Sequence, residues 1–257
     1  MKSQIGLGVL GIPSTLSVLG FFPGLLALVI FSAVTTWTGC LIGDFRLRHP
    51  SVHSIGDAGH LLFGPAGREF MGLSSCLFYT LSYGAAALTI SIAMNIITEY
   101  AICSLAWVGI AASISFIVGG ALRTMKSLVG FGYGAVISIT LGVWITAIAC
   151  LAQHRPALAP PTGPYDKMIV AFQASAFSAS MNAIGTQVLS LAGTASFFTI
   201  HAEMRDQGKW RTALLWGQAF VCFNYIVVGT LIYAKVGRYI ASPAVVSAGP
   251  LVGKRNK

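Results

Sequence analysis

The sequence contains seven apolar runs, each long enough to cross a membrane as a helix, and this feature limits the fold more than any other. A hydrocarbon core about 30 Å thick requires roughly 20 apolar residues per spanning helix. Because the runs are long and do not alternate apolar and polar residues, they favour helices over strands. We therefore expect an all-α, polytopic transmembrane helix bundle of about seven spans. The approximate limits of the runs are 1–20, 22–43, 70–96, 103–122, 129–151, 179–202 and 213–236.

The composition agrees with a membrane protein. Hydrophobic residues make up 55% of the 257 residues, and only 9% are charged, whereas about a quarter of the residues of a soluble domain are charged. The formal net charge of +9 comes from 16 Lys and Arg against 7 Asp and Glu. These basic residues lie between the apolar runs and form no stripe with aromatic residues, so no nucleic-acid partner is expected.

The basic residues also predict the orientation of the chain. If the N-terminus is cytoplasmic, nine of the 16 basic residues lie on the cytoplasmic side of the runs. Cytoplasmic loops of membrane proteins carry an excess of Lys and Arg, so we expect this orientation. The basic tail does not fit the rule, because Lys254, Arg255 and Lys257 would lie outside.

The connection between the second and third runs, 44–71, is too polar to span a membrane. Its interspersed apolar residues predict a short interfacial helix around 54–63 that ends at Gly64-Pro65. His53 and Asp57 have the spacing of an acyltransferase acid–base pair, but a solvated amphipathic segment explains them more simply. No nucleophile elbow, phosphate loop or metal-binding motif occurs, and the five cysteines show no C-x-x-C spacing. We therefore expect no enzyme, no catalytic residue, no metal site and no cofactor.

The first run is interrupted by glycines, in the segment IGLGVLGIP. Gly6 and Gly8 weaken a helix near the middle of the membrane. One interpretation is a broken helix whose free backbone N–H groups bind a carboxylate without a buried Arg. The alternative is a glycine-lined surface on which another helix packs.

The sixth run has a similar interruption, because the small and polar segment 192–196 separates two apolar halves. Two interrupted helices in corresponding positions favour the binding site of a secondary transporter. An ordinary interface of small residues is the alternative.

Polar side chains in two other runs are further candidates. Tyr79 and Tyr83 are four residues apart and share a helix face, so either phenol could cover a ligand or be a packed aromatic. Gln218 and Asn224 in the seventh run are predicted to form hydrogen bonds between helices.

Several segments, in this order, resemble the amino acid/auxin permease family, and most closely its fungal neutral amino acid permeases. The segments are IGLGVLGIPS, LGFFPGLLALV, FRLRHPSVHSIGDAGHLLFGPAGREF, LAGTASFFTIHAEMRD and VGRYIASPAVVSAGP. The resemblance implies a leucine-transporter-type fold, which has two inverted five-helix repeats and about eleven spans. It implies a single transporter domain over 1–257, with the first repeat in 1–151 and the first two helices of the second repeat in 179–236.

The same resemblance implies secondary active transport of neutral amino acids by alternating access, with aromatic amino acids among the candidate substrates. The coupling ion would be a proton, with sodium as the alternative. The membrane would be the plasma membrane, with the vacuolar membrane as the alternative. Thr194 stands where family members often carry a His, and no acid within the spans matches a coupling residue. The implied substrate-binding residues are Ile5, Gly6, Leu7 and Gly8 at the first break, Ala192, Gly193 and Thr194 at the second, and Tyr79 and Tyr83.

The ends of the chain depart from the family pattern. About five residues precede Gly6, and the resemblance stops near Pro250, so we expect a chain truncated at both ends. Truncation would leave polar seams without a partner. The alternative function is therefore a non-transporting membrane interaction protein that pairs with a full-length permease.

Overall fold

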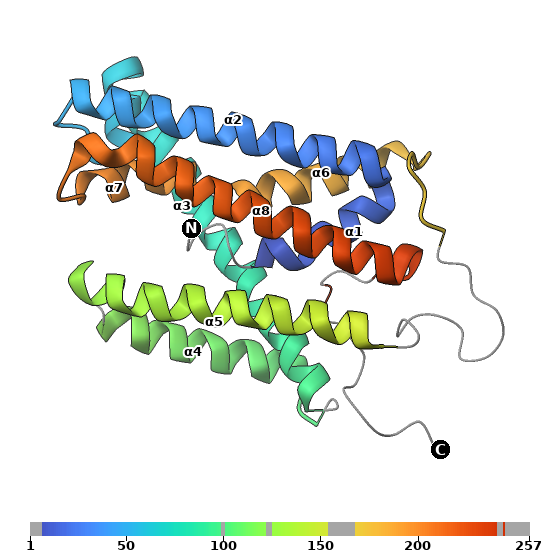
Figure 1. The fold of residues 1–257 in the computed structure, drawn as a ribbon. Helices are drawn as coiled ribbons and strands as arrows, with labels where there is room; N and C mark the ends of the chain where they lie inside the picture. Colours follow the sequence, from blue (N-terminus) through green and yellow to red (C-terminus); the bar gives the residue numbers. More distant parts are fainter. Residues whose placement is uncertain (1–6, 99–100, 122–124, 154–167, 241–243, 245–257) are drawn as a thin grey trace.

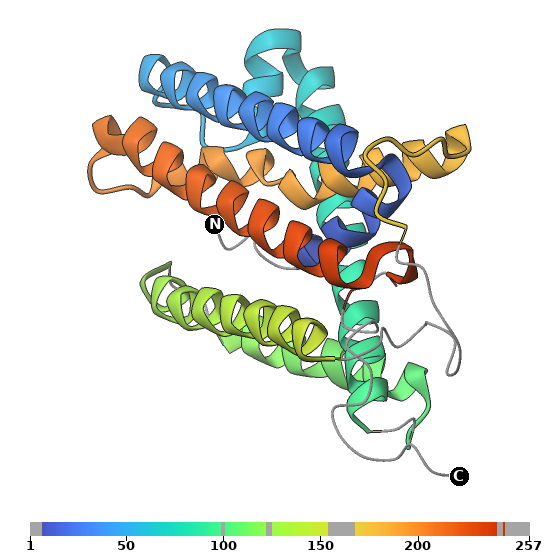
Figure 2. The same ribbon diagram turned by 45° about the vertical axis from the view of Figure 1, so that its right-hand side comes forward.

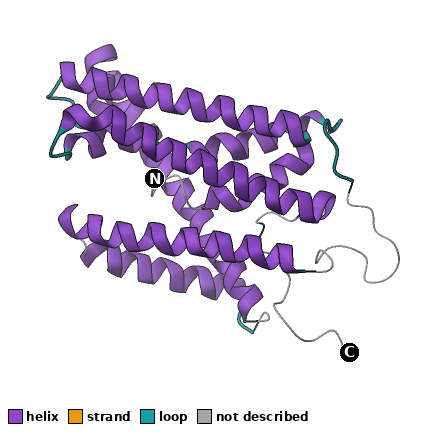
Figure 3. Ribbon diagram, viewed as in Figure 1, coloured by secondary structure: helices purple, strands orange, loops and turns teal. Residues whose placement is uncertain are grey.

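The computed structural model describes residues 7–98, 101–121, 125–153, 168–240 and 244, and within these ranges every regular element is a helix (Figures 1 and 3). The α-helices are α1 (Leu7–Leu19), α2 (Phe21–Arg48), α3 (Ile55–Ile97), α4 (Ser104–Ala121), α5 (Met125–Ala152), α6 (Phe177–Leu191), α7 (Phe197–Ala202) and α8 (Trp210–Val236). Three single-turn 3₁₀ helices complete the set: η1 (Thr194–Ser196), η2 (Gln207–Lys209) and η3 (Gly237–Tyr239).

Four of the described helices, namely α2, α3, α5 and α8, are long and apolar enough to cross a membrane. They correspond to the second, third, fifth and seventh runs, so the prediction of an all-helical membrane protein is confirmed. We expected about seven spans, but among the described helices only these four have the full length of a span. The described part of α1 and the helix α4 are apolar but shorter. The sixth run does not form one long helix but is divided into α6 and α7.

The core is the place where α1 crosses α6 and α8 (Figures 1 and 2). Val9 and Ile12 of α1 are buried against Tyr225, Val228 and Ile232 of α8. The helix α2 lies beside α8 on one side, and α5 lies along α8 on another. Lipid chains are as apolar as these side chains, so close packing rather than removal from water stabilises such contacts in a membrane.

The helix α3 is bent near its beginning, because Gly64 has the non-helical backbone angles φ 71° and ψ −159° and is followed by Pro65. Ser54 and Asp57 form a capping box at its start: the Ser54 hydroxyl accepts from the Asp57 backbone N–H at 3.1 Å, and the Asp57 carboxylate accepts from that of Ser54. The predicted short helix that ends at Gly64-Pro65 is therefore confirmed. Beyond the bend, α3 crosses the molecule diagonally and packs against α4 (Figure 2).

Candidate functional site

The sixth run is interrupted at the predicted residues. The helix α6 ends at Leu191, and Ala192 has extended backbone angles of φ −71° and ψ 110°. Gly193 follows with φ −155° and ψ −2°, and Thr194 then begins the single turn η1. Regular helical hydrogen bonding therefore stops between α6 and α7, and backbone groups of this segment become available to a ligand.

The first run shows close packing rather than a break in its described part. Ile5 and Gly6 lie outside the described residues, and α1 begins at Leu7. Gly8 is in the first turn of α1, where an added Cβ would lie 2.6 Å from Ser190 Cβ and 2.8 Å from Ser190 Cα. Gly8 therefore allows α1 to approach α6 at Ser190, two residues before the break, as the glycine-lined interpretation predicts.

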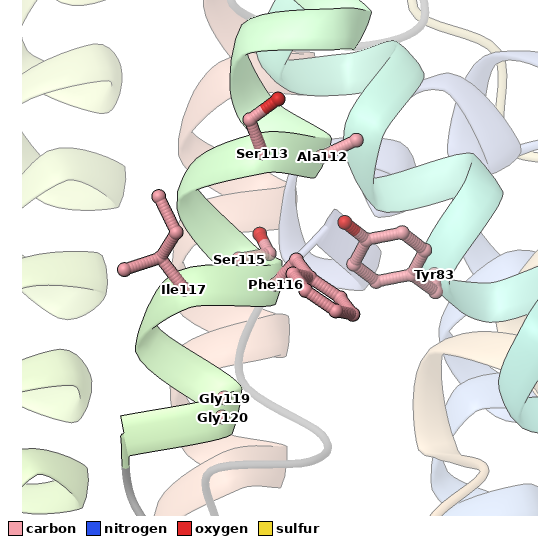
Figure 4. Close-up of a pocket in the computed structure, with 8 residues that line it drawn as sticks. All are labelled: Tyr83, Ala112, Ser113, Ser115, Phe116, Ile117, Gly119 and Gly120. Atoms are coloured by element: carbon pink, nitrogen blue, oxygen red, sulfur yellow. The ribbon is translucent and has the colours of Figure 1, made fainter.

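The two tyrosines of α3 have different surroundings. The hydroxyl of Tyr79 shares a hydrogen bond of 2.9 Å with the hydroxyl of Ser196 in η1. Tyr83, one turn later, lines an open cavity of about 910 Å³ together with residues of α4 (Figure 4). The structure therefore brings Tyr79 to the interruption of the sixth run and places Tyr83 beside α4.

Two side chains around the break, Tyr225 and Gln187, were not singled out from the sequence. Tyr225 of α8 donates its hydroxyl to the backbone oxygen of Ser190 at 2.8 Å, which joins α8 to the end of α6. Gln187 is fully buried and donates to the Thr15 hydroxyl at 2.9 Å and to the Gly24 oxygen at 3.1 Å. An amide inside an apolar run is a signal for such a bond, but its partners are more than 160 residues away.

The two polar residues of the seventh run differ. The indole N–H of Trp144 in α5 donates to the Asn224 side-chain oxygen at 3.2 Å, so the predicted bond between helices is confirmed for Asn224. Gln218 is buried, but neither atom of its amide has a partner among the described residues. The prediction is therefore not met for Gln218, which borders a cavity of about 160 Å³ beside α7.

A second polar group lies where α2 ends. The Nε of Arg46 donates to the Val52 oxygen at 2.8 Å. Its Nη1 lies 3.3 Å from Nδ1 of His201 in α7, and its Nη2 lies 3.2 Å from Nδ1 of His53. We call Arg46, His53 and His201 the Arg46 cluster. Among the described residues, no imidazole is bonded to the carboxylate of Asp57, which accepts from the backbone N–H groups of His53 and Ser54; this does not support an acid–base pair.

Exposed ion pairs lie at the same end. Arg211 of α8 donates from Nε to Asp44 of α2 at 3.1 Å. Lys209 lies 3.1 Å from Asp206 in the turn before α8, and this hydrogen bond lowers the pKa of Asp206. No group of three or more potential metal ligands occurs in the described part of the chain.

Comparison with known proteins identifies the family. The model of a family described as transmembrane amino acid transporter protein matches residues 1–251. A transmembrane transporter of Fusarium pseudograminearum is 28% identical over 99% of this chain. The N amino acid transport system protein of Neurospora crassa is 28% identical over 97% of it. The amino acid transporter AVT3C of Arabidopsis thaliana is 23% identical over 91% of it.

The chain spans about half the length of these curated relatives: the matches cover 53% of the two fungal proteins and 57% of the plant protein. No solved structure matches the chain.

Proposed function

The chain belongs to the transmembrane amino acid transporter family, and on this premise we propose that it serves the secondary active transport of neutral amino acids by alternating access. Membership makes it an integral membrane protein of a transporter family and not an enzyme. The observation that carries the proposal is the interruption of the sixth run, which lies beside the close crossing of α1 and α6. A membrane helix exposes backbone groups at such a point only where they are buried in protein or line a cavity.

The proposed substrate site uses the glycine-containing segment 5–8 and the interruption at 192–196. The carboxylate of the amino acid would bind the backbone N–H groups of residues 5–8, where the N-terminal end of α1 carries a partial positive charge. The side chain of the substrate would lie near residues 192–194 and Tyr79. The hydrogen bond between Tyr79 and Ser196 supports this part of the proposal, because it fixes the phenol beside the break. Tyr83 would contribute from the next turn of α3.

The class of substrate is supported by the names of two relatives, which are an amino acid transport system protein and an amino acid transporter. We propose a proton as the coupling ion, with sodium as the alternative, and neutral amino acids as substrates, aromatic ones among them. The N-terminus would be cytoplasmic and the membrane the plasma membrane, with the vacuolar membrane as the alternative.

The proposed architecture is part of the leucine-transporter-type fold. Residues 1–151 would form one five-helix repeat, and 179–236 the first two helices of the other. The packing of α1 against α6 supports this assignment, because they would be the first helices of the two repeats, and the inverted repeats of this fold meet around the substrate site.

Uptake by reconstituted chain tests the proposal. The full chain in liposomes should accumulate radiolabelled neutral amino acids when an inward proton gradient is applied, and Tyr79→Phe should lower the rate about three- to tenfold, the effect of one lost hydrogen bond. Tyr133→Phe is the matched control, because Tyr133 is exposed on α5. Equal rates in both variants would contradict the assigned site.

The alternative, a non-transporting membrane protein that pairs with a full-length permease, is favoured by one observation. Beyond the bend, α3 is exposed over most of its length, and an open cavity lies between Tyr83 of α3 and residues of α4 (Figure 4). Affinity purification from cells that contain a full-length permease distinguishes the two functions. Uptake by the purified chain alone supports transport, whereas no uptake and a co-purified permease support the alternative.

A further inference from the structure

Arg46 is a buried cation in the last turn of α2, with only 3% of its surface exposed. Its acceptors are the Val52 oxygen and one nitrogen each of His53 and His201. Within the described part of the chain, no carboxylate forms an ion pair with it. A buried guanidinium depends strongly on its hydrogen bonds, since an unpaired buried charge is costly. Arg46 therefore depends on both imidazoles as hydrogen-bond acceptors.

The geometry fixes the protonation of both imidazoles. A guanidinium only donates, so Nδ1 of each ring must accept, and each ring is neutral with its proton on Nε2. In His201, which is fully buried, this Nε2–H has no partner among the described residues. A second proton, bound at Nδ1, would displace the N–H of Arg46 and place two positive charges side by side.

Other charged groups on the neighbouring elements do not compensate for such a proton. They are Asp44, Arg48 and His49 on α2, Asp57, His60, Arg68 and Glu69 on α3, Glu203, Arg205, Asp206 and Lys209 between α7 and α8, and Arg211 on α8. Asp206 is paired with Lys209. Asp44 is paired with Arg211. Asp57 is occupied by the backbone at the start of α3. Among the described residues, none of these carboxylates is hydrogen-bonded to either imidazole.

The cluster connects α2 with α7, the second half of the interrupted run, because Arg46 and His201 are in contact although they are 155 residues apart in the sequence. We infer that Arg46 is a positioning residue that holds α7 against α2 through the neutral imidazole of His201, and that a proton on Nδ1 of His201 releases α7. The inference rests on the proposed function, because alternating access requires helices to move around the site. Acid on this side of the membrane would thus shift the protein away from the conformation described above.

The molecule contains its own reporter of this event. The ring of His201 lies 5.1 Å from that of Trp210, centroid to centroid, in an edge-on arrangement. A protonated imidazole in contact with an indole quenches its fluorescence more than a neutral one. Protonation of His201 and the release of α7 both change the surroundings of this indole, so the tryptophan emission of the purified full chain should change in one transition as the pH is lowered from about 7.5 to about 5.

Two variants separate positioning from simple packing. His201→Gln should abolish the transition, because a carboxamide oxygen can accept from Arg46 but takes no proton in this range. Arg46→Gln should move the midpoint to a higher pH by about one unit, because protonated His201 then no longer lies beside the positive charge of Arg46. His60→Gln is the matched control, since His60 is exposed on α3, and it should leave the transition unchanged.

Each result decides the inference. A transition that persists in His201→Gln, or a midpoint that Arg46→Gln does not move, overturns it. If Arg46→Gln does not fold, hydrogen exchange of the wild-type chain replaces it: the amides of α7 should lose protection in acid while those of α1 keep it, and unchanged α7 protection overturns the inference. None of these measurements needs transport. If the fluorescence transition occurs as described but the chain takes up no amino acid, only the proposed function is contradicted. If the chain takes up amino acids but shows no fluorescence transition, only the positioning role of Arg46 is overturned.

Discussion

At the scale of single residues, small side chains decide how closely the helices approach. Gly8 has space for no side chain, because Ser190 occupies the position that a Cβ would take. Gly185, five residues before Ser190 on the same helix α6, has nothing within 4 Å of that position. Two glycines in apolar runs therefore have different roles, and only the structure distinguishes them.

Gly8→Ala should destabilise the protein by about 1–3 kcal/mol, because the methyl group forces α1 and α6 apart. Gly185→Ala should be neutral or slightly stabilising, since alanine favours a helix over glycine. Thermal unfolding in detergent, followed by circular dichroism, measures both. A Gly8→Ala protein as stable as the Gly185→Ala protein would show that α1 and α6 do not cross closely in solution.

At the scale of elements, the bend in α3 separates a short capped helix from a long one. Gly64 adopts a conformation that is essentially restricted to glycine, with φ 71° and ψ −159°. The short first part carries the capping box and leads from the Arg46 cluster to the long second part, which carries Tyr79. The angle at Gly64 therefore sets where Tyr79 meets the break.

Gly64→Ala should cost about 1–3 kcal/mol of stability, because alanine is strained in this conformation. It should also lower uptake, since a relaxed bend moves the phenol of Tyr79. Gly72→Ala is the control: Gly72 lies in the helix and has open space around it. The prediction fails if both variants unfold at the same temperature.

Some of these elements are predictable from the sequence, and others are not. The short helix before Gly64-Pro65 and the interruption at 192–196 are local features, and their turn-forming or small residues are sufficient to predict them. The contact of Gly8 with Ser190 and the Arg46 cluster depend on how helices cross, which periodicity does not encode. Because Gly8 contacts Ser190, a Gly8→Val substitution would disturb the packing of α1 against α6. Loss of uptake in this variant would therefore not distinguish a binding role of Gly8 from a packing role.

At the scale of the whole molecule, the two ends of the bundle are defined by contacts between distant segments. The Asp44–Arg211 pair and the Arg46 cluster bring the α2–α3 connection and the beginning of α8 to one end. The other end contains the beginning of α2, where the backbone N–H of Phe21 donates to the Val170 oxygen at 3.1 Å. In the proposed orientation, the first end is cytoplasmic.

Cysteine labelling tests this orientation. Ser51 and Ala174 are exposed and lie at the two opposite ends. A membrane-impermeant maleimide should label Ser51→Cys only after the cells are opened and should label Ala174→Cys in intact cells. The reverse pattern would invert the orientation, and equal labelling of both in intact cells would contradict the placement of the two ends.

The central claim is that the interrupted sixth run, with Tyr79 beside it, forms a site for a neutral amino acid. Equilibrium binding of a radiolabelled neutral amino acid to the purified chain tests this claim most directly, because it requires neither a gradient nor a partner. We expect saturable binding by the wild-type chain and by Tyr133→Phe, and binding about three- to tenfold weaker by Tyr79→Phe. Saturable binding that Tyr79→Phe leaves unchanged, or no saturable binding of any neutral amino acid, would contradict the account.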